Sequence, residues 1–362
     1  MPSSPESVFS FSLRCAAMTF VVPVIEDLHD PALSARLQHL IDHKTKPVGS
    51  LGVLETLALR IGAILGSESP RLEAPQMLVC AADHGLAARG VSAYPSDVTW
   101  QMVENFLAGG AAVSVLARQH GLALTVADCG VAHDFAPRPG LVQVKVARGT
   151  ADASAGPAMT AGQRDQALAN GAALVRGLPG NALLLGEMGI GNTSAASLLL
   201  ARLGGVPLAE CVGAGTGLDS AGIDRKRAVL LQVLALHSGA AAPLDALAAF
   251  GGFEIATLVG AVLQAAAERR VVLVDGFITT AAVLVAAALA PHVLQRCVFA
   301  HRSGEVGHAA MLAHLEAEPL LDMGLRLGEG SGAALAWPML VSACSVLGDM
   351  ASFESAGVST AE

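Results

Sequence analysis

The chain has few aromatic and few charged residues. Aromatic side chains make up 4% of its 362 residues and charged side chains 15%, whereas 53% are hydrophobic. The core must therefore consist mainly of Ala, Leu and Val, and a chain of this length can bury a large one. The formal net charge of -9 is spread along the sequence and includes no basic stripe. This distribution argues against a nucleic-acid partner.

The sequence also lacks paired cysteines and the common metal-binding motifs. It contains no C-x-x-C and no H-E-x-x-H, so we expect no metal and no cofactor. Widely spaced cysteines within apolar runs are typical of buried thiols in a cytoplasmic protein. The six cysteines are Cys15, Cys80, Cys129, Cys211, Cys297 and Cys344.

No apolar run is long and uninterrupted enough to predict a membrane span. The most apolar stretch, residues 277–294, is broken by Thr279-Thr280 and by Pro291, and we interpret it as a buried helix. Serines interrupt the apolar residues of the first 18, and the segment lacks the charged start of an export signal. We expect residues 1–24 to form a flexible extension and the protein to bind no membrane.

Two helices are predicted near residues 31–43 and 54–64, the first opened by Asp30-Pro31. From residue 76 the pattern changes to short apolar runs separated by helical segments, one of which begins with a capping box at Thr160. This alternation predicts an α/β fold, a doubly wound and mostly parallel sheet with helices on both faces. The predicted strands are residues 77–82, 122–127, 182–185, 271–274 and 297–300, with 141–146 as an edge strand.

Polar or glycine-rich clusters follow five of these strands. Because the carboxyl ends of parallel strands share one edge, we expect the clusters to line a common ligand crevice. They begin at Asp83, Asp128, Gly186, Asp275 and His301.

Two glycine-rich loops are candidate phosphate sites. The loop 186–192 leads into a predicted helix over residues 193–203 with Asn192 as its cap, and the loop 213–219 precedes a helix that carries Lys226. An ordinary turn and a solvated lysine are the alternatives at this stage. Neither loop matches a dinucleotide fingerprint or an ATP-binding P-loop.

Several other polar residues allow two interpretations. Ser92 and Gln101 could be only hydrogen-bonding capping residues of a helix that starts near residue 97, or they could hold a heteroaromatic ring nitrogen. His84 and His301 are expected to orient loops by hydrogen bonds. Glu329 lies among glycines just before an Ala-rich run (333–336), where its side chain can approach a ligand closely. We hypothesise that Glu329 is the catalytic base of a glycosyl-transfer reaction.

Seven short segments of the chain, taken together and in order, resemble the nicotinate-nucleotide:dimethylbenzimidazole phosphoribosyltransferase family. The resemblance extends from about residue 25 to residue 350. The segments are 46–55 (Lys-Pro-x-Gly-Ser-Leu-Gly-x-Leu-Glu), 82–85, 90–95, 186–193, 213–219, 301–303 and 327–332.

The resemblance implies a Rossmann-like large domain (76–334) and a small helical domain formed by both ends of the chain (25–75 and 335–362). It also implies a homodimer. The implied reaction transfers 5-phosphoribosyl from nicotinate mononucleotide to 5,6-dimethylbenzimidazole, giving α-ribazole 5′-phosphate and nicotinate. This product supplies the lower ligand of cobalamin.

By the same resemblance, Glu329 corresponds to the general base of the family. Four residues would line the benzimidazole pocket, namely Ser92, Gln101, Met188 and Leu327. The ribose and phosphate would be held by Glu187, Gly189, Gly191, Asn192, Gly215, Thr216, Gly217 and Lys226. Ser303 and Arg326 would lie near the nicotinate.

Two other functions remain open on the sequence alone. A doubly wound sheet also suits a nicotinamide-dependent oxidoreductase, although the G-x-G-x-x-G motif is missing after the first strand. A nucleotide-binding sensor without turnover would need the same phosphate loops.

Overall fold

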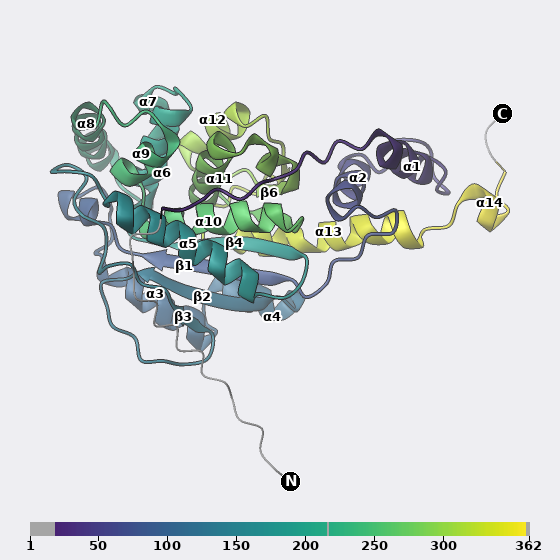
Figure 1. Cartoon of the computed structure of the whole chain (residues 1–362), viewed down its shortest axis with the longest axis horizontal. Coiled ribbons are helices and arrows are strands. Elements are labelled where there is room, and N and C mark those ends of the chain that lie inside the picture. Colours follow the sequence, from purple (N-terminus) through teal and green to yellow (C-terminus); the bar gives the residue numbers. More distant parts are fainter. Residues whose placement is uncertain (1–18, 216, 360–362) are drawn as a thin grey trace, which may run out of the picture.

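The centre of the molecule is a seven-stranded sheet in which every neighbouring pair of strands is parallel (Figure 1). The structure, a computed structural model, describes residues 19–215 and 217–359. The strand order is β3-β2-β1-β4-β5-β6-β7. The strands are β1 (Gln76–Ala82), β2 (Ala123–Gly130), β3 (Leu141–Gln143), β4 (Ala182–Met188), β5 (Val271–Val274), β6 (Cys297–His301) and β7 (Pro319–Leu321).

Six of the strands were predicted from the apolar runs, and the α/β fold class is confirmed. The edge strand β3 is shorter than predicted, ending at Gln143. Beyond it, Lys145 turns its ammonium group toward backbone carbonyls rather than continuing the alternation. The other edge strand, β7, was missed because three residues beginning with a proline form no recognisable run.

The two faces of the sheet contact two separate hydrophobic clusters. Along β1, Leu78 and Cys80 point into one cluster, whereas Met77 and Val79 point into the other. Successive side chains of a strand point to opposite faces of the sheet, and in β1 both faces are buried. The continuous apolar runs in the sequence reflect burial on both faces.

One face is covered by a thick helical layer. The tightest contact in it, between α5 and α10, depends on glycine: a Cβ at Gly171 would lie 1.8 Å from the Thr257 carbonyl oxygen. Figure 1 shows these helices crossing above the sheet. The layer comprises α5 (Ala161–Gly177), α6 (Asn192–Leu203), α7 (Leu208–Cys211), α8 (Ser220–Leu236), α9 (Pro243–Phe250), α10 (Phe253–Ala267), α11 (Phe277–Leu289) and α12 (Val306–His314).

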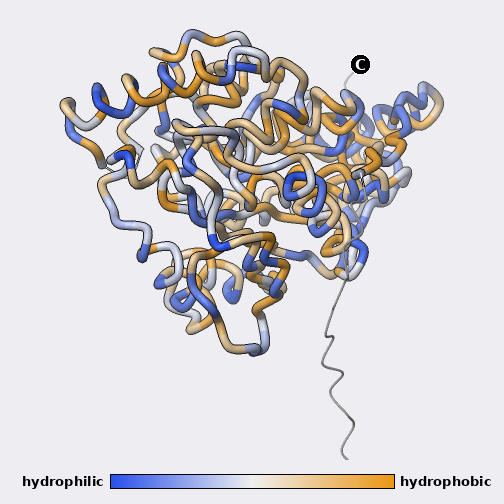
Figure 2. Tube along the Cα trace, turned by 60° about the vertical axis from the view of Figure 1, so that its left-hand side comes forward, coloured by the Kyte–Doolittle hydropathy of each residue, from blue (hydrophilic) through white to orange (hydrophobic). Residues whose placement is uncertain are grey.

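The opposite face carries fewer helices. They are α1 (Pro31–Asp42), α2 (Val53–Leu65), α3 (Asp97–Ala108), α4 (Ala112–His120) and α13 (Ser331–Asp349). Short segments complete the fold: η1 (Gly85–Arg89), η2 (Pro291–Arg296) and α14 (Phe353–Ala356). Apolar and polar residues alternate along the outer helices (Figure 2), as expected where only one side of a helix is buried.

The predicted helix starts and buried helix are present. Asp30 accepts a hydrogen bond from the Leu33 amide at the start of α1, and Thr160 with Gln163 forms a capping box on α5. The apolar helix α11 is buried along most of its length, as predicted.

Helices from both ends of the chain pack together beside the sheet. Figure 1 shows α13 extending from the sheet to α1 and α2. The connection between α1 and α2 is tied to the C-terminal segment, because the Thr45 amide donates to the Ala351 carbonyl oxygen at 3.0 Å. Since α13 crosses the boundary predicted at residue 335 as one continuous helix, the division into two domains stays a prediction.

Residues 1–18 of the predicted extension, with Cys15, lie outside the described residues. Residues 19–24 are described, and Phe20 and Val22 pack against the hydrophobic cluster on the α10 side of the sheet. The five described cysteines are free and buried, as expected of structural thiols.

Among the described residues, α13 is the one helix long and apolar enough to span a membrane. More than half of its most apolar window, 56%, is buried inside the protein. Ala333, Ala336 and Leu340 belong to the cluster under the sheet, so α13 is a core helix of this fold.

Candidate active site

The strand order reverses between β1 and β4, so the loops after these neighbouring strands diverge. This switch point is where open parallel sheets bind ligands. Asp83 and His84 follow β1, Glu187 lies near the end of β4, and Asp275 follows β5. The polar clusters predicted to meet at one edge of the sheet do meet there.

Glu329 lies at this edge in a backbone conformation that non-glycine residues rarely adopt. Its φ angle is 66°, between Gly328 at 81° and Gly330 at 95°. The carboxylate of Asp275 accepts hydrogen bonds from the Gly330 amide at 3.2 Å and from the Ala333 amide at 2.9 Å. These contacts fix the loop that carries Glu329.

The Glu329 carboxylate is buried, with 5% of the residue exposed. Burial raises the pKa of this carboxyl group, and the nearby charge of Asp275 raises it further. Hydrogen bonds from the backbone of Val113 and Ala112 act in the opposite direction. The net effect is a more basic carboxylate than an exposed glutamate would have.

A second buried carboxylate, Glu187, faces the same loop. A Cβ at Gly328 would lie 2.4 Å from Oε1 of Glu187, and the φ angle of 81° at Gly328 favours glycine there. Burial raises the pKa of Glu187 to about 8, with contributions from Asp275, Glu254 and Glu329, while the hydrogen bond from Asn192 lowers it. The Glu187 carboxyl group therefore lies beside Gly328, the residue before Glu329.

His84 is fixed by a buried ion pair beneath the site. Its Nε2 lies 2.6 Å from Oε1 of Glu254, and both side chains are almost fully buried. Burial alone would lower the pKa of His84, but the charges of Glu254 and Asp83 more than offset it, so the pKa is raised. His84 orients its loop by a hydrogen bond, as predicted.

The two glycine-rich loops meet at Lys226 of α8. This lysine is 1% exposed, and its Nζ donates to Oγ1 of Thr193 in the first turn of α6 at 2.8 Å. A Cβ at Gly215, in the second loop, would lie 3.6 Å from the same nitrogen. Burial lowers the pKa of Lys226 to about 8, against the opposing charge of Glu305. A buried ammonium group beside a bare glycine loop can bind an anion.

The loop after β6 connects this lysine to the Glu329 segment. The Gly304 amide donates to the Leu325 carbonyl oxygen at 2.8 Å, which places Ser303 near Arg326. Burial raises the pKa of Glu305 in the same loop, and the charges of Lys226 and Arg326 oppose the shift. His301 faces Asp275 at 3.7 Å between Nε2 and Oδ1.

The start of α3 lies against the loop after β4. Oγ1 of Thr99 accepts a hydrogen bond from the Ile190 amide at 3.1 Å, which joins this loop to α3, the helix that carries Gln101. Gln101 is exposed, and Ser92 is half-buried with its hydroxyl oxygen accepting from the Tyr94 amide at 3.3 Å. Met188 is half-buried and Leu327 is 58% exposed.

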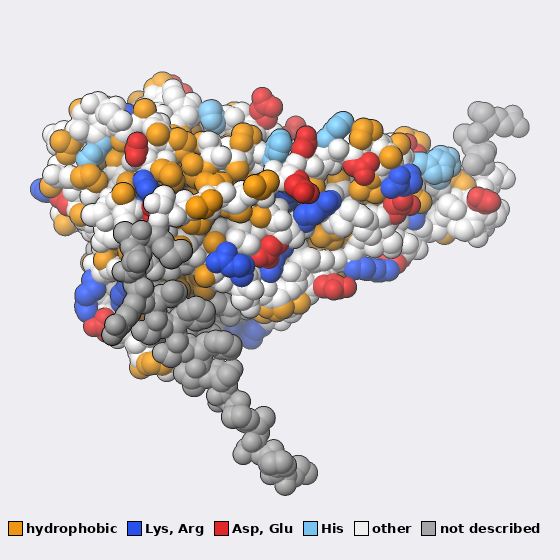
Figure 3. Space-filling model, in the orientation of Figure 1, with side chains coloured by type: hydrophobic (Ala, Val, Ile, Leu, Met, Phe, Trp, Pro, Cys, Tyr) orange, Lys and Arg blue, Asp and Glu red, His pale blue; other side chains and the backbone are white. Residues whose placement is uncertain are grey.

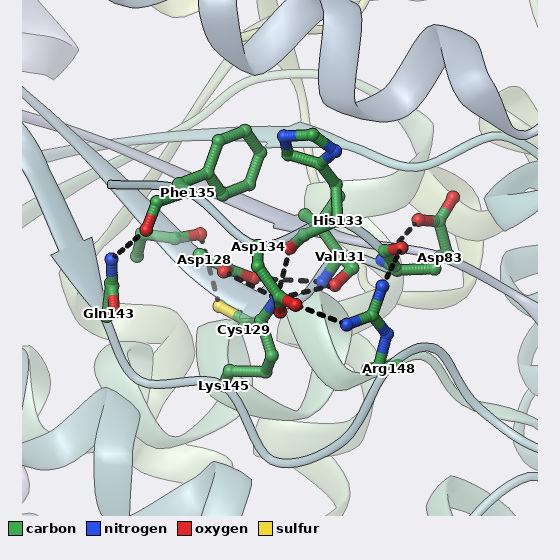
Figure 4. Close-up of polar contacts among 12 residues, drawn as sticks. Asp83, Asp128, Cys129, Val131, His133, Asp134, Phe135, Gln143, Lys145 and Arg148 are labelled. Atoms are coloured by element: carbon green, nitrogen blue, oxygen red, sulfur yellow. Dashed lines mark hydrogen bonds and ion pairs between the residues drawn. The ribbon is translucent and has the colours of Figure 1, made fainter. Parts of the chain in front are cut away.

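A polar network joins the segment after β2 to the residues at and after the end of β3 (Figure 4). Nζ of Lys145 donates to the carbonyl oxygens of Val131, at 2.7 Å, and of His133, and lies 3.1 Å from a carboxylate oxygen of Asp128. The ring of His133 then stacks on Trp100 of α3 with 4.8 Å between ring centroids. This ring contact joins the segment after β2 to α3, the helix that carries Gln101.

One predicted detail is wrong and several site residues were missed. Asn192 is the first residue of α6 rather than its cap, because Gly191 occupies the capping position in a left-handed conformation; the side-chain amide of Asn192 donates to Glu187 instead. Thr216 lies outside the described residues. Four residues that make these contacts were not among the predicted site residues, namely Thr99, Thr193, Glu254 and Glu305.

The fold and site define an α/β protein of Rossmann-like topology with a cluster of buried carboxylates at the carboxyl edge of its sheet. Comparisons with known proteins narrow this class. Residues 27–358 match the phosphoribosyltransferase family. A nicotinate-nucleotide–dimethylbenzimidazole phosphoribosyltransferase of Variovorax paradoxus (strain S110) is 74% identical over 338 residues, covering 93% of this chain and 97% of the relative.

Less similar relatives carry the same enzyme name. An enzyme of the same name from Dechloromonas aromatica (strain RCB) is 59% identical over 92% of this chain and 97% of its own. A crystal structure of the phosphoribosyltransferase of that name from Thermus thermophilus superposes with a TM-score of 0.88 at 41% identity, covering 92% of this chain and all of that one. The chain belongs to the nicotinate-nucleotide:dimethylbenzimidazole phosphoribosyltransferase family. The alternatives of an oxidoreductase and a sensor receive no support from these relatives.

Proposed function

We propose that this chain transfers the 5-phosphoribosyl group of nicotinate mononucleotide to 5,6-dimethylbenzimidazole, giving α-ribazole 5′-phosphate and nicotinate. The product is the nucleotide of the cobalamin lower ligand. The observation that carries the proposal is Glu329, a buried carboxylate with a raised pKa at the carboxyl edge of a Rossmann-like sheet. Family membership supports the same reaction.

The reaction is a single displacement at C1′ of the ribose. A ring nitrogen of the benzimidazole uses its lone pair to form a bond to C1′ on the face opposite the nicotinate. The bond from C1′ to the pyridinium nitrogen breaks, and its electron pair neutralises that ring. Attack from the opposite face converts the β-nucleotide into an α-nucleotide.

The attacking base must lose a proton from its other nitrogen once it is bonded to C1′. Glu329 accepts that proton in our proposal. Because burial raises the pKa of Glu329, its carboxylate holds a proton more strongly than an exposed glutamate would. A cationic leaving group departs without acid assistance, so we propose a reaction that needs neither metal nor cofactor.

The remaining roles are proposed on the placement described above and on the family resemblance. Lys226, buried beside Thr193 and the Gly215 loop, binds the phosphate. Glu187, Gly189, Gly191, Asn192, Thr216 and Gly217 hold the ribose and phosphate with it. The benzimidazole contacts Ser92, Gln101, Met188 and Leu327, while Ser303 and Arg326 lie toward the nicotinate.

We also propose that the protein is a cytoplasmic homodimer without membrane or nucleic-acid partners. The dimer rests on the family resemblance, and the compartment on the buried free thiols. On the face shown in Figure 3, Lys and Arg side chains lie among Asp and Glu side chains rather than in a basic stripe. Mass determination in solution tests the dimer.

Incubation with both substrates, followed by chromatography, tests the reaction. We expect free nicotinate and α-ribazole 5′-phosphate in equal amounts, and neither product when the benzimidazole is omitted. Binding of both substrates without release of nicotinate would instead indicate a sensor. A change in absorbance of a reduced nicotinamide cofactor with a third substrate would indicate an oxidoreductase.

A further inference from the structure

The unusual conformation of Glu329 needs support from outside its own loop. Three consecutive residues, 328–330, have positive φ angles, and the residue that caps α13 is Gly330, which has no side chain to accept the helix amides. The first turn of a helix leaves such amides without partners within the helix. Here they point at a carboxylate from a neighbouring strand.

Asp275 supplies that carboxylate from the end of β5. Its Oδ2 accepts from the Gly330 amide and its Oδ1 accepts from the Ala333 amide, at 3.2 and 2.9 Å. The side chain is 1% exposed, and His301 approaches its Oδ1 from β6. Asp275 thus serves as the cap of α13 from a distance of 55 residues in sequence.

We propose that Asp275 is a positioning residue for the transfer reaction, holding the amides of Gly330 and Ala333 so that Glu329 keeps its left-handed conformation and its place at the carboxyl edge of the sheet. The proposal rests on the proposed function, since it assigns Glu329 as the base. Asp275 acts through Glu329 and touches neither substrate.

The charge of Asp275 has a separate consequence for Glu329. The groups that face Glu329 are Asp275 from β5, Glu187 from β4 and the backbone amides at the start of α4, with His301 behind Asp275. Because like charges disfavour ionisation, Asp275 contributes to the raised pKa of Glu329 after burial. Removing this negative charge therefore lowers the pKa of the base.

The test compares two variants of Asp275 with a control in the same loop. Asp275→Asn is isosteric and keeps one acceptor but loses the charge, and Asp275→Ala loses both acceptors. The control is Ser331→Ala, which removes the hydrogen bond from Oγ of Ser331 to the Gly328 carbonyl oxygen at 2.7 Å and changes no charge. For each variant, thermal unfolding, kcat, both KM values and the pH profile of kcat/KM are measured.

We expect Asp275→Asn and Asp275→Ala to lower kcat by roughly 10- to 100-fold, the scale of a misplaced catalytic group. The KM for nicotinate mononucleotide should change little, and the acid limb of the kcat/KM profile should move to lower pH. Ser331→Ala should lower kcat less and leave the acid limb in place. The shift of the limb is the readout that a merely structural residue would not produce.

Four results would overturn the proposal. One is parent-like kcat in Asp275→Ala. Another is a large rise in the KM for nicotinate mononucleotide, which would make Asp275 a substrate ligand. The third is failure of Asp275→Asn to fold, and the fourth is an unmoved acid limb; either would leave a structural role only. Absence of both products with the parent enzyme would instead contradict the proposed function itself.

Discussion

The backbone of Glu329 lies directly over Gly186 of β4. A Cβ at Gly186 would be 2.2 Å from the carbonyl oxygen of Glu329 and 2.8 Å from its carbonyl carbon. No side chain fits in that space, so the sheet and the loop that carries the base touch through backbone atoms. The position of Glu329 therefore depends on a glycine in the strand as well as on the loop itself.

Gly186→Ala should displace the Glu329 loop and impair the reaction. The clash is with backbone atoms, which cannot rotate away, so we expect a stability loss of about 1–3 kcal/mol. The kcat should fall by at least ~10-fold because the base moves from its place. Steady-state kinetics and chemical unfolding measure the two effects.

Gly177→Ala is the matched control for that substitution. Nothing lies within 4 Å of a Cβ at Gly177, the last residue of α5. Its kcat should equal that of the parent protein. Parent-like kcat in Gly186→Ala as well would show that the contact does not position the base.

Lys226→Ala should weaken binding of the nucleotide far more than binding of the benzimidazole. The substitution removes the buried ammonium group beside the glycine loop, so the KM for nicotinate mononucleotide should rise by at least ~10-fold, as expected when a charged hydrogen bond is lost. Arg227→Ala, which removes an equal charge from the same helix, should leave both KM values near the parent values. Equal increases for both substrates in Lys226→Ala would indicate a structural role.

The same lysine predicts a pH dependence of nucleotide binding. Burial lowers the pKa of Lys226 to about 8 in the substrate-free protein, so its positive charge is lost as the pH rises through that value. The KM for nicotinate mononucleotide should therefore increase above about pH 8 in the parent protein, and this increase should be absent from Lys226→Ala. A KM with the same alkaline dependence in both proteins would exclude Lys226 as its source.

Glu187→Gln should change how stability depends on pH. Burial raises the pKa of Glu187 from 4.5 to about 8, so between these values the folded state binds more protons than the unfolded state. The free energy of unfolding of the parent should then fall as the pH rises from about 4.5 to 8. The glutamine keeps an acceptor for Asn192 and carries no charge. The stability of the variant relative to the parent should therefore increase as the pH rises across that range.

Urea unfolding of the substrate-free parent and of Glu187→Gln at pH 5 and pH 8 measures the effect. Between pH 5 and pH 8, the difference in the free energy of unfolding between the two proteins should shift in favour of the variant by more than about 1 kcal/mol, the equivalent of roughly one pKa unit. A difference that stays constant between the two pH values would mean that Glu187 ionises normally.

Local signals in the sequence predicted most of the fold. The capping residues Asp30 and Thr160 marked helix starts, and strands buried on both faces gave continuous apolar runs. The rule that ligands bind at the carboxyl edge of a parallel sheet then placed the polar clusters together. These features depend on residues close together in sequence, so they could be recognised without coordinates.

The contacts within the site could not be predicted in the same way. Ile190 pairs with Thr99 across 91 residues, and His84 pairs with Glu254 across 170. Thr99 and Glu254 each lie in a helix where their residue types are unremarkable. Asn192 was assigned as a cap because its type favours that position, but the left-handed turn at Gly191 shifted the helix start by one residue.

The most direct test of Glu329 as the catalytic base is the turnover of the Glu329→Gln variant. The glutamine keeps the size of the side chain and an oxygen for the Val113 amide but cannot accept the proton. We predict a fall in kcat of ~100-fold or more, with folding and the KM for nicotinate mononucleotide nearly unchanged. Glu68→Gln, a substitution of an exposed glutamate paired with Arg36, should leave turnover unchanged. A Glu329→Gln variant that turns over at close to the parent rate would contradict the assignment of Glu329 as the base.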